Sequence, residues 1–280
     1  MYAYFGSECA SYEERVQYPN TGVDAMELRT VAAVLAAAGA GLAMMYANAK
    51  LAMLREHEAA ICAEQDGSGP DIFFISDIHR RRVSRELIRK AGGPFDAVII
   101  GGDLAERGVP ESRIRRNIMR LAALGPLYYV WGNNDREVGE ALIRSAISDA
   151  GGTVLDNESA VLMAGPVRWV LVGTDDTSSF NVDVDQAFRN VRRGDAVIFI
   201  SHSPSVFEML GQKDPEVRMA GHTHGGQIRL GRFGMLEKGR FRSDNGKVEL
   251  VSNGYGTSLV PLRLGAPAES HIIRLRAKKK

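Results

Sequence analysis

Hydrophobic and polar positions alternate in blocks along the chain from residue 71 onwards. Short apolar runs, typical of buried strands, are followed by longer segments in which apolar residues recur every three or four positions, as they do on one face of a helix. The first half therefore predicts strands at residues 71–75, 97–100 and 127–131 and helices at residues 83–91, 111–124 and 138–150. This alternation of strands and helices indicates a largely parallel sheet with helices packed on it.

The pattern becomes richer in strands after Gly151. Short helices are expected at residues 184–191 and 205–211. The expected strands are residues 161–164, 169–172, 196–200, 217–220, 227–230, 248–251 and 271–275. Together the two halves predict an α/β fold in which two mixed sheets are stacked and helices cover the outside.

The N-terminal part differs from the rest, because a polar and mildly acidic tail over residues 1–30 precedes an uncharged run over residues 31–49. As a helix this run would be about 28 Å long, close to the thickness of a hydrocarbon core. The sequence favours a transmembrane helix here. A secretory signal ending at Ala47-Asn48-Ala49 and a helix docked on a soluble domain are the alternatives. Residues 50–64 are expected to continue as a charged helix, and a linker is expected to complete the segment 50–69.

Lysine and arginine residues close to the apolar run are nearly balanced, with Arg15 and Arg29 before it and Lys50 and Arg55 after it. The positive-inside rule therefore only slightly favours a cytoplasmic location for the residues that follow the run. We expect a single-pass protein of the cell membrane with the globular domain that follows the run in the cytoplasm; a secreted or cell-wall-facing domain is the alternative.

The overall composition excludes some classes of function. The chain has 280 residues and a net charge of +1, without the basic excess of nucleic-acid-binding proteins, so no nucleic-acid partner is expected. The two cysteines, Cys9 and Cys62, lie outside the patterned region and have no C-x-x-C spacing. A disulfide framework and a thiolate metal site are therefore not expected.

Five of the predicted strands are followed directly by side chains that can bind metal ions. These side chains are Asp77, His79, Asp103, Asn133, His202, His222 and His224. Ligand sites in α/β proteins form beyond the carboxyl ends of the strands, so we expect these residues to converge. The spacing of two within Asp77–His79 and within His222–His224 directs each pair to the same side of an extended backbone.

The residue types indicate the kind of metal. Carboxylate, imidazole and amide oxygen together suit manganese, iron or zinc, and they suit an all-oxygen calcium site poorly. A lone D-x-H or G-G-D is more often a plain turn, but five such strand ends in one chain favour a metal site. His57 and His271 have no such context and are expected to be non-functional.

These motifs resemble those of the calcineurin-like metallophosphoesterase superfamily. The D-x-H motif is at residues 77–79, G-D at 102–103, a G-N-N-D form of the G-N-H-D/E motif at 132–135, the lone histidine at 202, and G-H-x-H at 221–224. The ending GHTHGGQI is similar to the bacterial branch of membrane-associated, YkuE-like phosphoesterases. The resemblance covers about residues 70–275 and implies a metallophosphoesterase domain over residues 70–276, folded as a four-layer αββα sandwich.

The resemblance also implies a division of the ligands between two divalent metal ions. One ion would be held by Asp77, His79, Asp103 and His224, and the other by Asp103, Asn133, His202 and His222, with Asp103 as the bridge. Asn134 stands where the family usually has a histidine placed against the leaving group. Asparagine donates a hydrogen bond but supplies no proton at neutral pH, so good leaving groups are expected to be preferred.

Two further groups of residues accompany the motifs. Arg80, Arg81 and Arg82 follow His79 directly, and we expect Arg80 to stabilise the transferring phosphoryl group; a solvated helix start is the alternative. Asp135 is expected to orient its own loop. Asp175 and Asp176 are expected to line the cleft or to position a metal ligand, with a plain turn as the alternative.

The resemblance implies a metal-dependent hydrolase of phosphate esters or diphosphates, in which a metal-bridging hydroxide attacks phosphorus in line. A phosphodiesterase or nuclease with the same metals and a non-catalytic metal-binding module are the alternatives. The expected partners are a phosphorylated small molecule or lipid-linked substrate, and a membrane that residues 31–49 cross.

Overall fold

The computed structural model describes residues 25–279. The chain consists of two compact units, Met1–Gly41 and Leu42–Lys280. Most of the expected polar tail, including Cys9, lies outside the described residues. In the first unit the described residues form most of helix α1 (Ala25–Lys50), whose last residues belong to the second unit. The second unit contains every other helix and strand that the structure describes.

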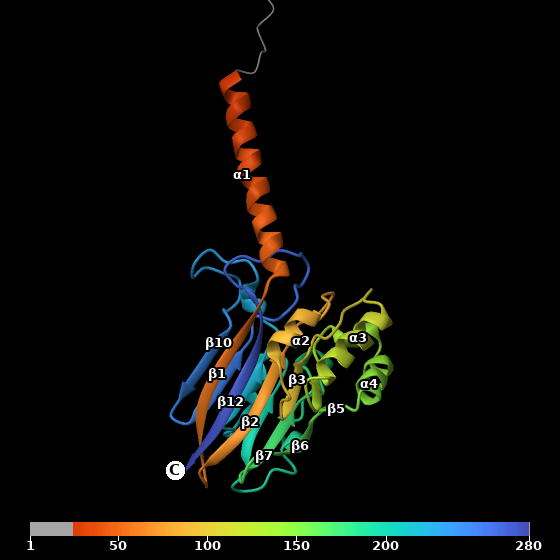
Figure 1. Cartoon of the computed structure of the whole chain (residues 1–280), viewed down its shortest axis with the longest axis vertical. Helices are drawn as coiled ribbons and strands as arrows, with labels where there is room; N and C mark the ends of the chain where they lie inside the picture. Colours follow the sequence, from red (N-terminus) through yellow and green to blue (C-terminus); the bar gives the residue numbers. More distant parts are fainter. Residues whose placement is uncertain (1–24, 280) are drawn as a thin grey trace, which may run out of the picture. The chain divides into compact units, whose positions relative to one another are not determined.

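Two six-stranded sheets form the second unit (Figure 1). In spatial order the first sheet contains β1 (Ala52–Ala63), β12 (Ala268–Lys279), β2 (Gly67–Ile75), β3 (Ala97–Gly101), β4 (Leu127–Val130) and β5 (Thr153–Val154). The second contains β10 (Arg240–Asp244), β11 (Lys247–Val251), β9 (Val217–Ala220), β8 (Ala196–Ile200), β7 (Arg168–Gly173) and β6 (Glu158–Met163). Each sheet has four parallel strands extended by antiparallel pairing, so both sheets are mixed, as predicted.

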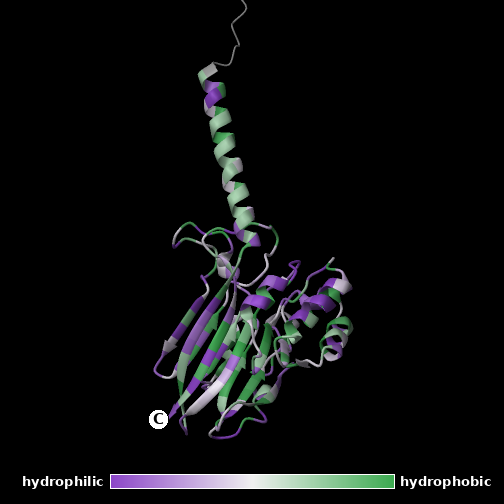
Figure 2. Ribbon diagram, in the orientation of Figure 1, coloured by the Kyte–Doolittle hydropathy of each residue, from purple (hydrophilic) through white to green (hydrophobic). Residues whose placement is uncertain are grey.

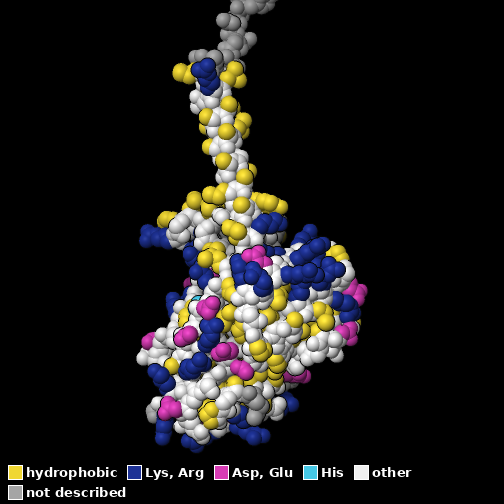
Figure 3. Space-filling view, viewed as in Figure 1, with side chains coloured by type: hydrophobic (Ala, Val, Ile, Leu, Met, Phe, Trp, Pro, Cys, Tyr) yellow, Lys and Arg dark blue, Asp and Glu magenta, His cyan; other side chains and the backbone are white. Residues whose placement is uncertain are grey.

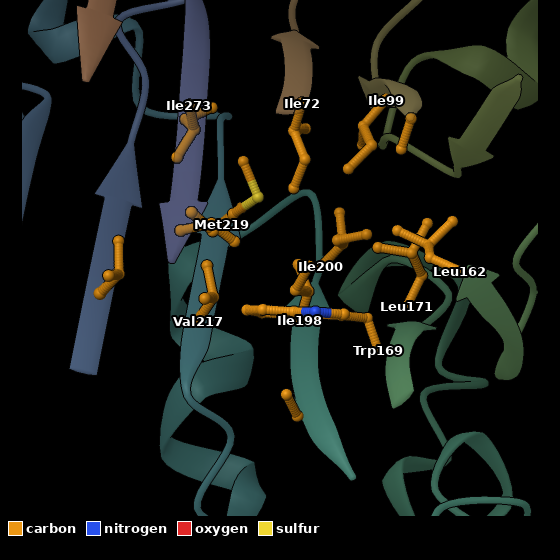
Figure 4. Close-up of a cluster of buried hydrophobic side chains, with 14 of the residues drawn as sticks. Ile72, Ile99, Leu162, Trp169, Leu171, Ile198, Ile200, Val217, Met219 and Ile273 are labelled. Atoms are coloured by element: carbon orange, nitrogen blue, oxygen red, sulfur yellow. The ribbon is translucent and has the colours of Figure 1, made fainter. Parts of the chain in front are cut away.

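Three buried clusters of apolar side chains define the layers. One lies between the sheets, where Trp169, Ile198 and Met219 of the second sheet meet Ile72 and Ile273 of the first (Figure 4). A second lies between the first sheet and α2 (Arg85–Ala91), α3 (Glu111–Ala122) and α4 (Glu140–Asp149). The third lies between the second sheet and α5 (Val184–Ala187) with the 3₁₀ turn η3 (Pro204–Leu210). Strands such as β3 and β8 are therefore buried on both faces, which explains their uninterrupted apolar runs. The predicted α/β sandwich with helices outside is confirmed.

The charged helix expected over residues 50–64 is wrong, because Ala52–Ala63 is strand β1, paired in parallel with β12 at the edge of the first sheet. Its charged residues resemble those on the solvent-exposed face of a helix. Ala59, Ile61 and Ala63 face the core, while Glu56 and Glu58 alternate with them towards solvent, as is typical of an edge strand. The expected linker also ends early, since β2 begins at Gly67.

Smaller differences concern short elements. Residues 227–230 form a loop with isolated bridges instead of a strand. The expected helices at 138–150 and 184–191 are shorter, because the 3₁₀ turn η1 (Asp135–Val138) precedes α4 and α5 has a single turn. Strands β5 and β10 were not predicted, since two residues and a charged edge give little apolar signal.

Helix α1 is apolar along most of its length (Figure 2). Met26–Lys50 is the one helix among the described residues that is long and apolar enough to cross a membrane, a criterion that a signal sequence near the N-terminus also meets. The helix therefore covers the expected span at residues 31–49 and extends beyond it at both ends.

Candidate metal centre

The seven predicted ligands lie together at the carboxyl ends of five strands, which come from both sheets. Strands β2, β3 and β4 supply Asp77, His79, Asp103 and Asn133, and strands β8 and β9 supply His202, His222 and His224. The loops are braced against one another through backbone hydrogen bonds. Asp77 N–H donates to the Gly102 carbonyl at 3.0 Å, and His79 N–H donates to the Asp103 carbonyl at 3.0 Å.

Five of these ligands have left-handed backbone, with φ of 54° at Asp77, 49° at His79, 51° at Asp103, 70° at His222 and 49° at His224. Such a conformation is costly for residues other than glycine and persists only where the surrounding structure enforces it. Its repeated use at these positions shows that the loops are held to a specified geometry.

Two glycines make room for this geometry. Gly102 has φ of +81°, and a Cβ there would lie 2.5 Å from Nδ1 of His202. A Cβ on Gly132 would lie 2.1 Å from the backbone nitrogen of Asp103. Both distances are far below van der Waals contact, so side chains at these positions would displace a ligand.

The first group of ligands surrounds Asp77. Nε2 of His79 lies 3.0 Å from Nε2 of His224, and Nε2 of His224 lies 3.4 Å from Oδ1 of Asp77. Asp103 reaches this group as well, since its Oδ2 lies 3.5 Å from Nε2 of His79. All four side chains are buried.

The second group shares Asp103 with the first. Oδ2 of Asp103 lies 3.4 Å from Nε2 of His202, which in turn lies 3.2 Å from Oδ1 of Asn133. Nδ1 of His222 lies 3.0 Å from the same Asn133 oxygen. His222 is exposed and Asn133 is half-buried, so this group opens towards solvent. The two groups match the chemistry of borderline divalent metals, which take carboxylate, imidazole and amide oxygen ligands. Candidate metal-binding triplets are Asp77 with His79 and His224, and Asp77 with Asp103 and His202.

The charges of the site perturb its titrating groups. Burial raises the pKa of Asp103, but the nearby His202 and His79 and the N–H of Asn134 outweigh it and bring the pKa well below the usual value. Burial lowers the pKa of His202, but Asp103 and Asp77 outweigh it and raise the pKa to about 10. Burial lowers the pKa of His224 to about 4. His202 therefore holds a proton at neutral pH, and a cation that binds this histidine is expected to release it.

Asn134 and Asp135 act on the ligands that flank them. The backbone and side-chain N–H groups of Asn134 donate to the two oxygens of Asp103 at 2.8 and 2.7 Å, so Asn134 fixes the orientation of this carboxylate. Asp135 is fully buried and accepts from the N–H groups of Ala105 and Gly132 at 3.0 and 2.9 Å. It therefore ties its own loop to the loop of Asp103, in agreement with the expectation.

Two supporting residues were not found from the sequence. Oε2 of Glu106 lies 3.0 Å from Nδ1 of His79, on the far side of the ring from the other ligands. The guanidinium of Arg263 is fully buried, donates to the carbonyls of Asn253 and Gly256 at 2.7 and 2.6 Å, and lies 3.2 Å from Nδ1 of His224. Glu106 and Arg263 lie outside the motifs, and only the tertiary fold brings them to the histidines.

A cleft of about 550 Å³ is lined by Asn134, which hydrogen-bonds to the proposed ligand Asp103. Its walls also include Arg80, Arg81, Glu106, Arg107 and residues 256–261. Arg80 is largely exposed, pairs with Glu106, and donates to the Arg107 carbonyl at 3.2 Å. Arg81 instead binds backbone carbonyls, including that of Tyr255 at 2.6 Å, so its role is structural.

The remaining candidates are accounted for in other ways. Asp175 is buried and forms two 2.9 Å contacts with the guanidinium of Arg136. Asp176 accepts from Ser178 N–H at 2.8 Å and caps the 3₁₀ turn η2 (Thr177–Ser179), which is the plain-turn alternative. Nε2 of His57 lies 3.1 Å from Nδ1 of His271.

Comparison with known proteins matches residues 70–226 to the calcineurin-like phosphoesterase family. The chain is 41% identical to the uncharacterized protein YpbG of Bacillus subtilis over 88% of this chain and 96% of that protein. It is 30% identical to the phosphodiesterase YaeI of Escherichia coli over 59% of this chain and 65% of that protein. It is 24% identical to the uncharacterized metallophosphoesterase YkuE of Bacillus subtilis over 53% of this chain and 55% of that protein. This similarity agrees with the predicted resemblance to YkuE-like phosphoesterases.

Proposed function

The chain belongs to the calcineurin-like phosphoesterase family, and we propose that it is a binuclear metal-dependent hydrolase of phosphate esters or diphosphates. The convergence of seven ligands from five strand ends into two groups that share Asp103 supports the proposal. The first ion would bind Asp77, His79, Asp103 and His224. The second would bind Asp103, Asn133, His202 and His222.

Two divalent cations at such a site supply a hydroxide nucleophile at neutral pH and neutralise the charge of the phosphoryl group. The chain contributes the geometry. Ser76 Oγ donates to Oδ2 of Asp77 at 2.5 Å, and the His222 backbone N–H donates to Oδ1 of the same carboxylate at 3.1 Å. Asn134 holds the shared Asp103 in the same way. These contacts fix the carboxylates before a cation binds, which is the preorganisation that metal sites require.

Arg80 is proposed to bind the phosphoryl group of a substrate in the cleft. A guanidinium has five N–H donors, of which Glu106 and the Arg107 carbonyl take two in this structure. The others suit bidentate binding of phosphate oxygens. An Arg80→Ala variant should lose kcat/KM at unchanged metal content, and an unchanged kcat/KM would contradict this role.

The test of the overall activity uses the purified full chain with manganese added. Hydrolysis of bis-p-nitrophenyl phosphate and of p-nitrophenyl phosphate should both depend on the metal, stop with a chelator, and be lost in Asp103→Asn. A matched Glu137→Gln variant on the same cleft should remain active. Failure of the chelator or of Asp103→Asn to stop turnover would refute a metal-dependent mechanism.

A phosphodiester is the second candidate substrate, because the relative YaeI is named a phosphodiesterase. The same pair of substrates distinguishes the two. A much higher kcat/KM for the diester than for the monoester would favour a phosphodiesterase, and the reverse would favour a phosphomonoesterase.

We also propose that α1 anchors the chain in the cell membrane with the catalytic domain in the cytoplasm, and that the substrate is a phosphorylated small molecule or a lipid-linked phosphate. The length and apolar character of Met26–Lys50 support the anchor. Protease protection of the second unit in sealed inverted vesicles would contradict the cytoplasmic orientation, because that domain should be digested there.

A further inference from the structure

Large apolar side chains are exposed on three segments of the second unit. They lie on the last turns of α1 and at Leu51 directly after it, on the loop after the 3₁₀ turn η4 (His224–Gly226), and on the loop that lines the cleft (Figure 3). Leu259 is 100% exposed, Met235 is 94% exposed and Leu230 is 73% exposed. The set comprises Leu42, Met44, Tyr46, Leu51, Ile228, Leu230, Phe233, Met235, Leu236, Leu259 and Val260.

Hydrogen bonds join the three segments into one surface. The side-chain amide of Gln227 donates to the carbonyls of Ser258 and Val260 at 3.0 and 2.9 Å. Arg263 N–H donates to the carbonyl of Met45 at 3.0 Å, which connects the cleft loop to the end of α1. These hydrogen bonds therefore hold in place the loops that carry the exposed apolar side chains.

This surface, named here the apolar rim, differs from an ordinary protein surface. Single exposed apolar residues are common, whereas a contiguous group of them marks an interaction site. The residues 256–265 contain no acidic side chain, and Glu237, the acidic residue of the loop 227–239, pairs with Arg240 at 2.6 Å. Exposed Lys50, Arg232 and Lys238 lie among the apolar residues. Apolar tips flanked by basic side chains suit the interface of an anionic bilayer.

The position of the rim along the chain identifies the bilayer as its occupant. Leu42, Met44 and Tyr46 belong to the same continuous helix as the candidate span Met26–Lys50. A helix that enters the bilayer holds the residues hydrogen-bonded to its end close to the membrane surface. No comparable observation in the described residues supports a soluble protein as the partner of this surface.

We propose that the apolar rim inserts into the membrane interface, so that the mouth of the cleft faces the lipid surface. The proposal rests on anchoring by α1 and does not depend on the reaction that the metal centre catalyses. Its consequence is that substrates reach the cleft along the bilayer, which favours amphiphilic phosphates over phosphates that are free in solution.

The test introduces tryptophan into the rim of the full chain. Met235→Trp and Leu259→Trp variants are reconstituted into vesicles of phosphatidylethanolamine and phosphatidylglycerol with and without brominated acyl chains, which quench nearby tryptophan. The native Trp131 and Trp169 are fully buried and give a constant background. The matched control is Gln65→Trp, an exposed position in the turn between β1 and β2, about 30 Å from the site along β2.

Quenching at positions 235 and 259 without quenching at position 65 is the expected result. Equal quenching at all three positions, or none at 235 and 259, would overturn the proposal, as would a chain that fails to float with the vesicles. Because the readout does not need turnover, an inactive enzyme with a quenched rim would contradict the proposed hydrolase and leave the rim supported.

Discussion

Replacement of Glu106 by glutamine should weaken metal binding, although Glu106 is not itself a proposed ligand. Its carboxylate lies 3.0 Å from Nδ1 of His79, whose other nitrogen points to Asp103 and His224. Burial lowers the pKa of His79, but Glu106 and the charges of Asp103 and Asp77 outweigh it and raise the pKa. The contact with His79 lowers the pKa of Glu106, so the carboxylate is charged at neutral pH.

The magnitude follows from the chemistry of this contact. A carboxylate behind a histidine ligand fixes the ring and increases its basicity, and loss of such a partner typically costs about 10- to 100-fold in metal affinity, or about 1.4–2.7 kcal/mol. Glutamine keeps the shape and an acceptor oxygen but removes the charge. The Glu106 side chain is only 18% exposed, so solvent screens the pair weakly.

The assay is a titration of the metal-free full chain with manganese, followed by activity and by a competing chelator. Glu106→Gln should shift the midpoint by about 10- to 100-fold. Glu137→Gln should not shift it, because Glu137 accepts from Arg107 N–H at 3.0 Å on the same cleft but contacts no ligand.

Glu106 also pairs with Arg80, and a double-mutant cycle separates the two contacts. If Glu106 acts through His79, its substitution should weaken metal binding equally in the Arg80→Ala background. A midpoint unchanged within about twofold, or an equal shift in Glu137→Gln, would refute the reasoning.

Two other predictions concern catalysis and acid stability. Asn134→His restores a side chain that can donate a proton at neutral pH, and should raise turnover of alkyl phosphates by at least about 10-fold relative to aryl phosphates; an unchanged ratio would show that leaving-group protonation does not limit the rate. Burial, with the charges of His57 and Arg55, lowers the pKa of His271 from 6.5 to about 3, so the neutral form is favoured in the folded state. The resulting stability is present above pH 6.5 and is lost as the pH falls towards 3, by about 2 kcal/mol between about pH 7.5 and about pH 5. Urea unfolding should show this loss in the parent and about 2 kcal/mol less of it in His271→Gln, whereas equal losses would contradict the assignment.

The sheets and the metal ligands were predictable from the sequence because the ligands lie directly after buried strands. Each ligand follows a strand whose last residues are buried, so a short apolar run and the polar residue after it indicate both the sheet and the site. Edge strands carry no such signal. In β1, Arg55, Glu56 and Glu58 resembled a helix surface, and only the pairing with β12 places them on a strand.

The residues that support the ligands were hidden for a different reason. Arg263 is 39 positions from His224 and contacts it because the loop after β11 folds back under the metal centre. A lone arginine in a loop has many possible partners, and the local sequence pattern does not select one. Asn134 departs visibly from the G-N-H-D/E motif, but its two hydrogen bonds to Asp103 depend on the loop conformations.

The central claim is that two divalent ions share Asp103. The most direct measurement is the metal content per chain of the purified protein, loaded with manganese and freed of excess ion, for the parent and for Asp103→Asn. The account predicts two ions per parent chain, and loss of both ions and of phosphoesterase activity in the variant. A single ion in a fully active parent, or two ions retained by Asp103→Asn, would contradict it.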